Sequence, residues 1–87
     1  MFNIIFVILH YQNIDDTINC IDSIKKLQEL NNNYKILLVD NKSPNNTGKE
    51  LEKIYINDSN IEIILLEKNY GFSKANNIAF KMAKKYN

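Results

Sequence analysis

The sequence predicts an α/β protein, a three-layer sandwich in which three parallel strands and three helices alternate in the order β-α-β-α-β-α. Three short runs rich in Ile, Val and Leu predict the strands, at residues 3–9, 35–40 and 61–66. Such runs, bounded by turn residues, are typical of strands that are buried on both faces. Each segment between them carries apolar residues at helical spacing. A helix in each crossover makes neighbouring strands parallel.

The first predicted helix covers residues 14–30 and has one apolar face. Asn13 is the expected N-cap, and the acidic pair that follows, Asp15 and Asp16, suits the positive end of the helix dipole. Cys20 falls within the helical pattern, and we expect its side chain to be buried as a small hydrophobe. The apolar face consists of Ile14, Ile18, Ile21, Ile24, Leu27 and Leu30.

The second predicted helix covers residues 45–56, with Ser43 as its cap and Pro44 as its first residue, because proline is well tolerated there. A glycine turn at Gly71 precedes the third predicted helix. One face of that helix is apolar and the other is mostly lysine. The apolar face consists of Phe72, Ala75, Ala79, Met82, Ala83 and Tyr86.

Composition places the chain, residues 1–87, among single-domain soluble globular proteins. It is 45% hydrophobic and 24% charged, and its net charge of +1 gives no general attraction to nucleic acid. No apolar run approaches the ~20 residues needed to span a bilayer. One cysteine cannot form an internal disulfide, which suits a cytoplasmic location.

Three loops leave the same edge of the predicted sheet, at residues 10–13, 40–43 and 67–73. Ligands of open parallel sheets bind beyond the carboxyl ends of the strands, so we expect a ligand to touch all three loops. The first loop contains no glycine. This excludes the glycine-rich phosphate cradle of dinucleotide-binding proteins.

The first two loops contain one aromatic and one acidic candidate. Tyr11 offers a flat ring that could stack on a base, or it is a loop tyrosine that packs on its neighbours. Asp40 ends a buried strand, where a carboxylate could accept hydrogen bonds from a ribose or a base. The alternative for Asp40 is a turn residue that bonds its own backbone.

The third loop combines Gly71, Ser73 and Lys74 at a helix N-terminus, which suits an anion. The alternative is a glycine turn followed by a serine cap. Asn76 and Asn77 are poor helix formers, so at least one is expected to have a side-chain role, unless both are solvated.

No catalytic or metal-ligating arrangement is visible in the sequence. His10 has no evident partner, and no Ser/His/Asp, Cys/His or metal-binding spacing occurs. A phosphate-accepting receiver domain fits poorly, because the first strand is followed by His10 and Tyr11 rather than by acids. Nucleotide binding is therefore the function that the loops favour.

The three loops together resemble the start of the family 2 glycosyltransferases, which are inverting enzymes with the GT-A fold, and most of all their rhamnosyltransferase-like bacterial group. Residues 8–12, Ile-Leu-His-Tyr-Gln, resemble the family's first strand, which usually ends in Thr-Tyr-Asn. Residues 38–43, Leu-Val-Asp-Asn-Lys-Ser, resemble its Val-Asp-Asn-x-Ser segment. Residues 69–79 resemble its Asn-x-Gly-Phe-x-x-Gly-Asn-Asn-x-Gly segment, with Ala75 and Ala79 in place of glycines.

The resemblance implies a Rossmann-like, nucleotide-binding half of a GT-A fold and a nucleoside diphosphate sugar as ligand. Tyr11 would lie against the nucleobase and Asp40 would hydrogen-bond to it, while residues 71–77 would line the ribose and diphosphate site. The nucleotide-binding residues that it implies are Tyr11, Asp40, Asn41, Gly71, Lys74 and Asn77.

The resemblance also implies a divalent cation, Mg²⁺ or Mn²⁺, held in the full-length enzyme by an Asp-x-Asp-like motif that follows the next strand. We expect this chain to be truncated before that motif and to be inactive alone. The implied role is the donor-binding half of an enzyme that makes polysaccharide or cell-surface glycan, in the cytoplasm or at the cytoplasmic face of the membrane. An inactive nucleotide-binding module or a truncated remnant is the alternative.

One edge of the first predicted strand could pair with a strand of another chain. Residues 3–9 carry no charge, and in a three-stranded sheet one side of this strand lacks a neighbour. Exposed apolar strand edges pair with other chains. We therefore expect self-association through this edge.

Overall fold

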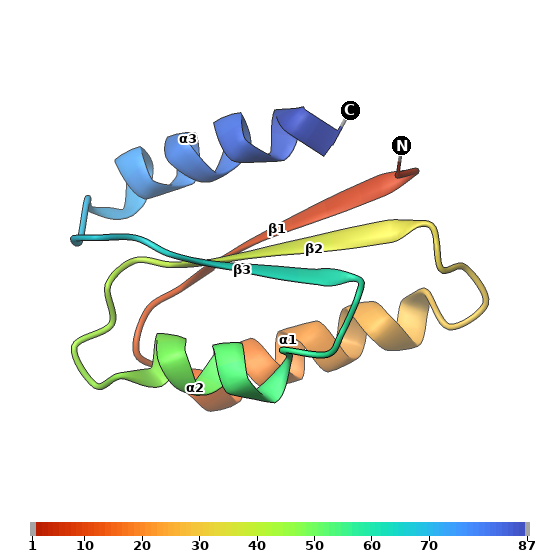
Figure 1. Cartoon of the computed structure of the whole chain (residues 1–87), viewed down its shortest axis with the longest axis horizontal. Coiled ribbons are helices and arrows are strands. Elements are labelled where there is room, and N and C mark those ends of the chain that lie inside the picture. Colours follow the sequence, from red (N-terminus) through yellow and green to blue (C-terminus); the bar gives the residue numbers. More distant parts are fainter. Residues whose placement is uncertain (1, 87) are drawn as a thin grey trace.

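A three-stranded parallel sheet forms the middle layer of the computed structural model, which describes residues 2–86 (Figure 1). The strands lie in the order β1 (Ile4–His10), β2 (Tyr34–Asp40) and β3 (Ile61–Leu65), so that β2 is central. Both strand pairs are parallel. The predicted fold class, number of strands and strand direction are confirmed.

The register aligns the carboxyl ends of the three strands. His10 pairs with Asp40, and Asp40 pairs with Leu65 on the other side. The loops that follow these residues therefore begin side by side at one edge of the sheet. This is the edge at which the sequence predicts a ligand.

Helices cover both faces of the sheet (Figure 1). Two of them, α1 (Ile14–Leu27) and α2 (Thr47–Ile54), lie on one face, and α3 (Phe72–Ala83), which ends in the short 3₁₀ turn η1 (Lys84–Tyr86), lies on the other. Crossovers of one hand that step from β1 to β2 to β3 place their helices on the same face. Helix α3 follows the last strand and lies on the opposite face, where it packs mainly on β1.

Alternate residues of β2 supply two apolar cores. Ile36 and Leu38 face α1 and α2, whereas Leu37 and Val39 face α3, and all four are fully buried. Burial on both faces is the reason that this segment reads as an uninterrupted apolar run in the sequence.

Small side chains let α3 pack close to the sheet. Ala75, Ala79 and Ala83 are its buried residues, and they pack with Leu37 and Val39. The alanines that replace the glycines of the family pattern therefore fill the interface between α3 and the sheet. Phe72, expected on the same face, is instead exposed.

The first helix is shorter than predicted, and three of the residues assigned to it are placed differently. Helix α1 ends at Leu27, which is 80% exposed rather than part of the apolar face, and Leu30 is 99% exposed in the loop that follows. Cys20 is exposed, so the prediction of a buried thiol is wrong. The buried positions are Thr17, Ile21 and Ile24, and Cys20 lies to one side of that stripe. The predicted cap is confirmed, because Asn13 Oδ1 accepts a hydrogen bond from the Asp16 N–H at 3.1 Å.

The second helix begins later than predicted. Ser43 and Pro44 do not start it, because the hydroxyl and N–H of Ser43 bond to the Asp40 side chain. Asn46 precedes the helix in a left-handed conformation, with φ of 66°. The physical reason is competition, since an aspartate at the start of a turn captures the groups that would otherwise cap a helix.

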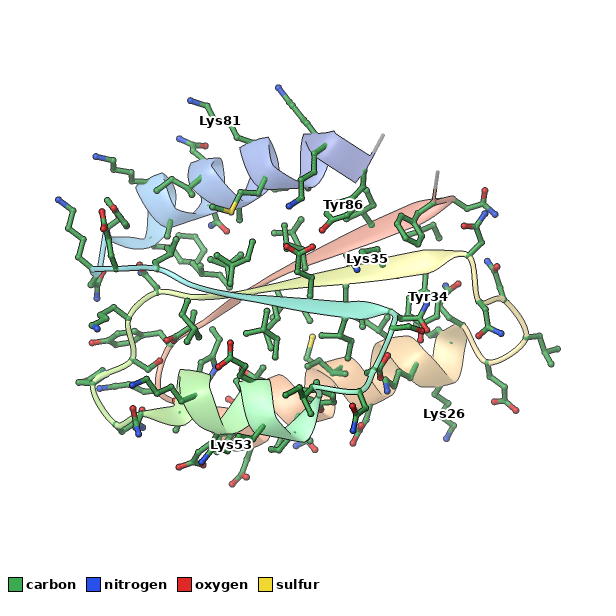
Figure 2. All side chains as sticks on the ribbon, in the orientation of Figure 1. Lys26, Tyr34, Lys35, Lys53, Lys81 and Tyr86 are labelled. Atoms are coloured by element: carbon green, nitrogen blue, oxygen red, sulfur yellow. The ribbon has the colours of Figure 1, made fainter. Side chains whose placement is uncertain are left out.

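The outer faces of both helix layers carry lysines. Lys26 of α1, Lys53 of α2 and Lys81 of α3 point away from the sheet (Figure 2). At the amino end of the sheet, the Lys35 ammonium lies 5.3 Å from the centroid of the Tyr86 ring, near which Figure 2 shows it. Of the helices between residues 2 and 86, none has the length and apolar character to cross a membrane.

We predict that Ala79→Leu destabilises the protein by about 1–3 kcal/mol, because the added atoms have no space between α3 and β2. Thermal or urea unfolding measures the change. Lys81→Ala on the outer face of the same helix is the control, and its effect should stay within about 0.5 kcal/mol. Equal stability of the two variants would contradict the close packing of α3.

Candidate functional site

Side chains from the second loop hold the first and third loops in place at the carboxyl edge of the sheet. The three loops follow β1, β2 and β3. The key residues of the second loop are Asp40, Asn41 and Ser43, all buried. The loops therefore form one polar cluster of fixed shape.

Asp40 organises its own turn. Its Oδ1 accepts hydrogen bonds from the Ser43 hydroxyl at 2.6 Å and from the Ser43 N–H at 3.2 Å. The side chain is only 6% exposed. The Ser43 N–H also approaches Oδ2, at 3.4 Å, and Oδ2 lies against Gly48 of α2. Asp40 thus has the turn role that the sequence offered as the alternative, and its contact with a ligand stays a prediction.

Asn41 fixes the third loop. Its side-chain oxygen accepts from the Tyr70 N–H at 3.0 Å, and its amide group donates to Asn69 Oδ1 at 3.1 Å. Asn69 Oδ1 also accepts from the Gly71 N–H at 2.7 Å. Asn41 therefore sets the backbone path that leads into α3.

Gln12 connects the first loop to the second. Its N–H donates to Ser43 Oγ at 2.9 Å, and its carbonyl oxygen accepts from Asn45 Nδ2 at 3.0 Å. Ser43 thus joins Gln12 on one side to Asp40 on the other. Displacement of one of these residues would disturb both loops.

Left-handed backbone conformations are concentrated in these loops. Gln12, Lys42 and Asn46 have φ of 66°, 60° and 66°, and Gly71 has φ of 78°. A left-handed conformation costs a non-glycine residue about 1–2 kcal/mol. Such strain persists where surrounding contacts determine the backbone, and it is common at binding sites.

A hollow of about 380 Å³ opens between the first and third loops. Tyr11, Asn41 and Gly71, three of the predicted site residues, line it. Tyr11 is 43% exposed, so part of its side chain is accessible to a ligand. The complete lining is Leu9, Tyr11, Asn41, Asn69, Gly71 and Phe72.

The other predicted site residues lie outside this lining. Asp40 is buried in the turn directly before Asn41. Lys74 and Asn77 are exposed residues of α3. The Lys74 ammonium lies 5.3 Å from the centroid of the Tyr70 ring. The structure thus gathers four of the six predicted residues at the loop cluster and places two on the helix beside it.

The N-terminus of α3 is well suited to an anion. Gly71 is its N-cap and provides no side chain to bond the first N–H groups. Two lysines stand nearby, since Lys68 and Lys74 both lie over the Tyr70 ring. The Tyr70 hydroxyl donates to Glu67 Oε1 at 3.0 Å, and this bond raises the pKa of Tyr70.

His10 joins the end of β1 to both helices on one face of the sheet. Its side chain is 1% exposed and lies between two hydroxyls, with Nδ1 2.7 Å from Thr17 Oγ1 of α1 and Nε2 2.7 Å from Thr47 Oγ1 of α2. The Thr47 hydroxyl donates to Asn45 Oδ1, so it must accept from Nε2–H. Nε2 therefore carries a proton, and in the neutral form of His10 Nδ1 accepts from the Thr17 hydroxyl.

Burial explains the charge state of His10. It lowers the pKa of the imidazole below 6.5, and the nearby Asp40 carboxylate offsets part of this effect. The sequence showed no partner for His10, because its two threonines come from different helices. The only sequence signal for these contacts is that polar residues fall at buried positions of amphipathic helices.

Gly48 allows α2 to approach Asp40. A Cβ atom at this position would lie 3.0 Å from Asp40 Cβ and would overlap the carboxylate. Sequence analysis missed this residue, although a glycine inside a helix often marks close approach. Gly48 is thus a positioning residue for Asp40.

The metal-ligating side chains of the described residues are dispersed. Among residues 2–86, no three His, Cys, Asp or Glu side chains gather in a way that could hold a metal ion. Of the Asp and Glu side chains in this range, only that of Asp40 is buried at the loop cluster.

Comparison with known proteins gives one positive finding. The family model described as Glycosyl transferase family 2 matches residues 5–86, nearly the whole chain. A search of curated proteins finds no match. The matched range contains all three loops of the candidate site.

We predict that Gly48→Ala destabilises the protein, although alanine is favoured over glycine in a helix by about 1 kcal/mol. The new methyl group collides with the Asp40 carboxylate, which its bonds to Ser43 hold in place. Denaturant unfolding measures the sign of the change. In an Asp40→Ala background the collision is removed, so Gly48→Ala should there be neutral or stabilising. Stabilisation in both backgrounds would contradict the close approach.

We predict that stability falls as the pH drops below 6.5. The folded-state pKa of His10 is lowered, so below pH 6.5 the unfolded state binds a proton that the folded state does not. The contribution is fully present above the unfolded pKa and is lost as the pH falls toward the folded pKa. Urea unfolding on both sides of pH 6.5 measures it. His10→Gln removes the only histidine, and a slope that persists in this variant would refute the assignment.

Proposed function

Because this chain belongs to glycosyl transferase family 2, we propose that it is the donor-binding part of a glycosyltransferase, and that the loop cluster binds the nucleotide of a nucleotide-sugar. One observation carries the proposal. The three loops that match the family motifs meet around a single hollow at the carboxyl edge of a parallel sheet. Ligands of open α/β sheets bind at this edge.

The nucleobase is proposed to enter the hollow against Tyr11. The half-exposed ring presents a flat apolar surface, and base–aromatic stacking contributes about 1–3 kcal/mol. Asn41 in the lining and Asp40 in the turn directly before it are proposed as the polar contacts at the base or the ribose. Because other hydrogen bonds already hold both side chains, binding requires little rearrangement.

The diphosphate is proposed to lie toward the N-terminus of α3. Gly71 leaves the first N–H groups of the helix without a side-chain cap, and the helix dipole favours negative charge there. Lys74 adds a positive charge within reach of this end, and Asn77 lies one turn further along the helix. Both are exposed and can reorient toward a phosphate.

The reaction proposed for the complete enzyme is inverting transfer. The acceptor hydroxyl oxygen bonds to the anomeric carbon, the bond from this carbon to the diphosphate oxygen breaks, and a base takes the hydroxyl proton. More specifically, we propose that it transfers a deoxysugar, as rhamnosyltransferase-like enzymes do. Its product would be a polysaccharide or cell-surface glycan made in the cytoplasm. The Mg²⁺ or Mn²⁺ that the family resemblance implies would neutralise the diphosphate, and residues 2–86 contain no cluster of three side chains that could hold it.

Nucleotide binding without transfer is the second candidate. It is favoured by what residues 2–86 contain. The loop cluster is proposed to contact a nucleotide, but no three side chains in this range gather in a way that could hold a metal ion. The only buried histidine is neutral and held between two threonines. The two candidates share the binding step, and an assay for sugar transfer separates them.

We predict saturable binding of one or more of uridine, deoxythymidine and guanosine diphosphates. Tyr11→Ala should weaken the affinity by about 5-fold to 150-fold, the equivalent of one lost stacking contact. Asp40→Ala should abolish binding. Calorimetry gives the affinities, and NMR shifts centred on Tyr11 and Asn41 locate the site.

The matched control is Asp58→Ala, because Asp58 pairs with Lys25 and lies in the turn before β3, at the opposite end of the sheet from the three loops. It should leave the affinity unchanged while it removes the same type of side chain as Asp40→Ala. Circular dichroism establishes that each variant is folded. A flat titration of the folded protein with all three nucleotides would exclude both candidate functions.

A further inference from the structure

Tyr11, the proposed contact of the nucleobase, is followed by a residue whose backbone is held on both sides. The Gln12 N–H donates to Ser43 Oγ at 2.9 Å, and the Gln12 carbonyl oxygen accepts from Asn45 Nδ2 at 3.0 Å. Both backbone groups of Gln12 are therefore bonded to side chains of the second loop. The Tyr11 side chain is 43% exposed, so its direction depends on this backbone more than on close packing.

The turn at Gln12 has a backbone conformation that glutamine does not favour. Its φ is 66°, in the left-handed region. There the Cβ atom crowds the following carbonyl oxygen, and glycine and asparagine are the residues that adopt this conformation most readily. Contacts must therefore maintain the turn, and the two backbone bonds to Ser43 and Asn45 are contacts of this kind.

Asn45 is itself held in one orientation. Its Oδ1 accepts from the Thr47 hydroxyl at 2.8 Å and from the Thr47 N–H at 3.4 Å. A backbone N–H can only donate, so the side-chain oxygen must face Thr47 and the amide nitrogen must face Gln12. The Asn45 amide cannot turn over without the loss of hydrogen bonds on both sides.

The same series of hydrogen bonds reaches the residue before Tyr11. His10 Nε2 lies 2.7 Å from the Thr47 hydroxyl. Bonds thus run from the His10 side chain through Thr47 and Asn45 to the Gln12 carbonyl. One group of side chains therefore fixes both neighbours of Tyr11.

We propose that Asn45 is a positioning residue for the nucleotide site, which keeps Gln12 in its left-handed turn and so presents Tyr11 to the hollow. This inference rests on the proposed nucleotide binding. Asn45 is not among the residues that line the hollow, so it acts through the first loop rather than by contact with the ligand. Apparent affinity falls with the fraction of molecules whose binding site is correctly arranged. Loss of the Asn45 bond therefore lowers the affinity although no ligand contact is removed.

The alternative role for Asn45 is confined to the start of α2. Its bonds to Thr47 lie at the first residue of this helix. If Asn45 acted only there, its loss would affect the helix, and a change of residue at position 12 would not compensate for it. A combination of substitutions at Gln12 and Asn45 therefore distinguishes the two roles.

The affinities for uridine, deoxythymidine and guanosine diphosphates, measured by calorimetry, test the proposal. Asn45→Ala should weaken binding by about 3-fold to 10-fold, the equivalent of one net hydrogen bond. In a Gln12→Gly background the same substitution should weaken binding clearly less, because glycine adopts positive φ without steric cost. Non-additivity of the two substitutions is thus the expected result.

The control in the same turn is Asn46→Gly. Asn46 has φ of 66°, which glycine adopts freely, and its side chain forms no cap bond to α2. This variant should keep the affinity of the unchanged protein. Circular dichroism and urea unfolding establish that each variant is folded. If Asn45→Ala does not fold, Asn45→Ser serves instead, because its hydroxyl can still accept from the Thr47 N–H.

A second measurement needs no ligand. Backbone chemical shifts report the conformation of Gln12 in the free protein. In Asn45→Ala they should move away from their left-handed values, and in Asn46→Gly they should not. If the unchanged protein binds none of the nucleotides, the proposed function fails, whereas these shifts still decide whether Asn45 holds the turn.

The proposal is wrong if Asn45→Ala leaves either the affinity or the Gln12 shifts unchanged. It is also wrong if Asn45→Ala weakens binding equally with glutamine and with glycine at position 12, because Asn45 would then act through α2. An equal loss of affinity in Asn46→Gly would assign the effect to general damage of the turn and would overturn the proposal as well.

Discussion

Parallel pairing of β2 between β1 and β3 is the constraint on which the rest of the structure depends. A strand without exposed surface must pair all its backbone groups with neighbours, because an unpaired buried amide costs free energy. Its alternating side chains must then be covered by a helix layer on each face. Ile36 and Leu38 meet one layer, and Leu37 and Val39 meet the other. The in-register ends of the strands bring three loops to one edge.

The loops at that edge owe their shape to side chains rather than to regular structure. Asp40 and Asn41 provide acceptors for backbone N–H groups of their own turn and of the third loop. Among residues 2–86, no buried side-chain nitrogen or oxygen lacks a hydrogen-bond partner. A fully satisfied polar cluster is rigid, and a rigid cluster is a good framework for recognition. The same residues can therefore support the loops and contact a ligand.

The crossing of α3 to the opposite face has two consequences. Its N-terminus arrives beside the loop cluster, where Gly71 and Phe72 complete the hollow. Its remaining length then lies over β1 and closes the apolar core on that face of the sheet. The candidate nucleotide site and this core thus both depend on the position of one helix.

The sequence by itself determined the order of elements, the strand direction, the edge of the sheet at which the three loops meet, and the family. Apolar runs and helical spacing are local patterns, and the loop motifs are contiguous, so each can be recognised without coordinates. The start of α2 at Thr47 was decided by competition between local hydrogen bonds, in which the Ser43 hydroxyl bonds to Asp40 instead of capping a helix. Only the tertiary structure placed His10 between Thr17 and Thr47, brought Gly48 against Asp40 and exposed Cys20. These contacts join residues far apart in the chain, and packing of the helices on the sheet alone decides which of them meet.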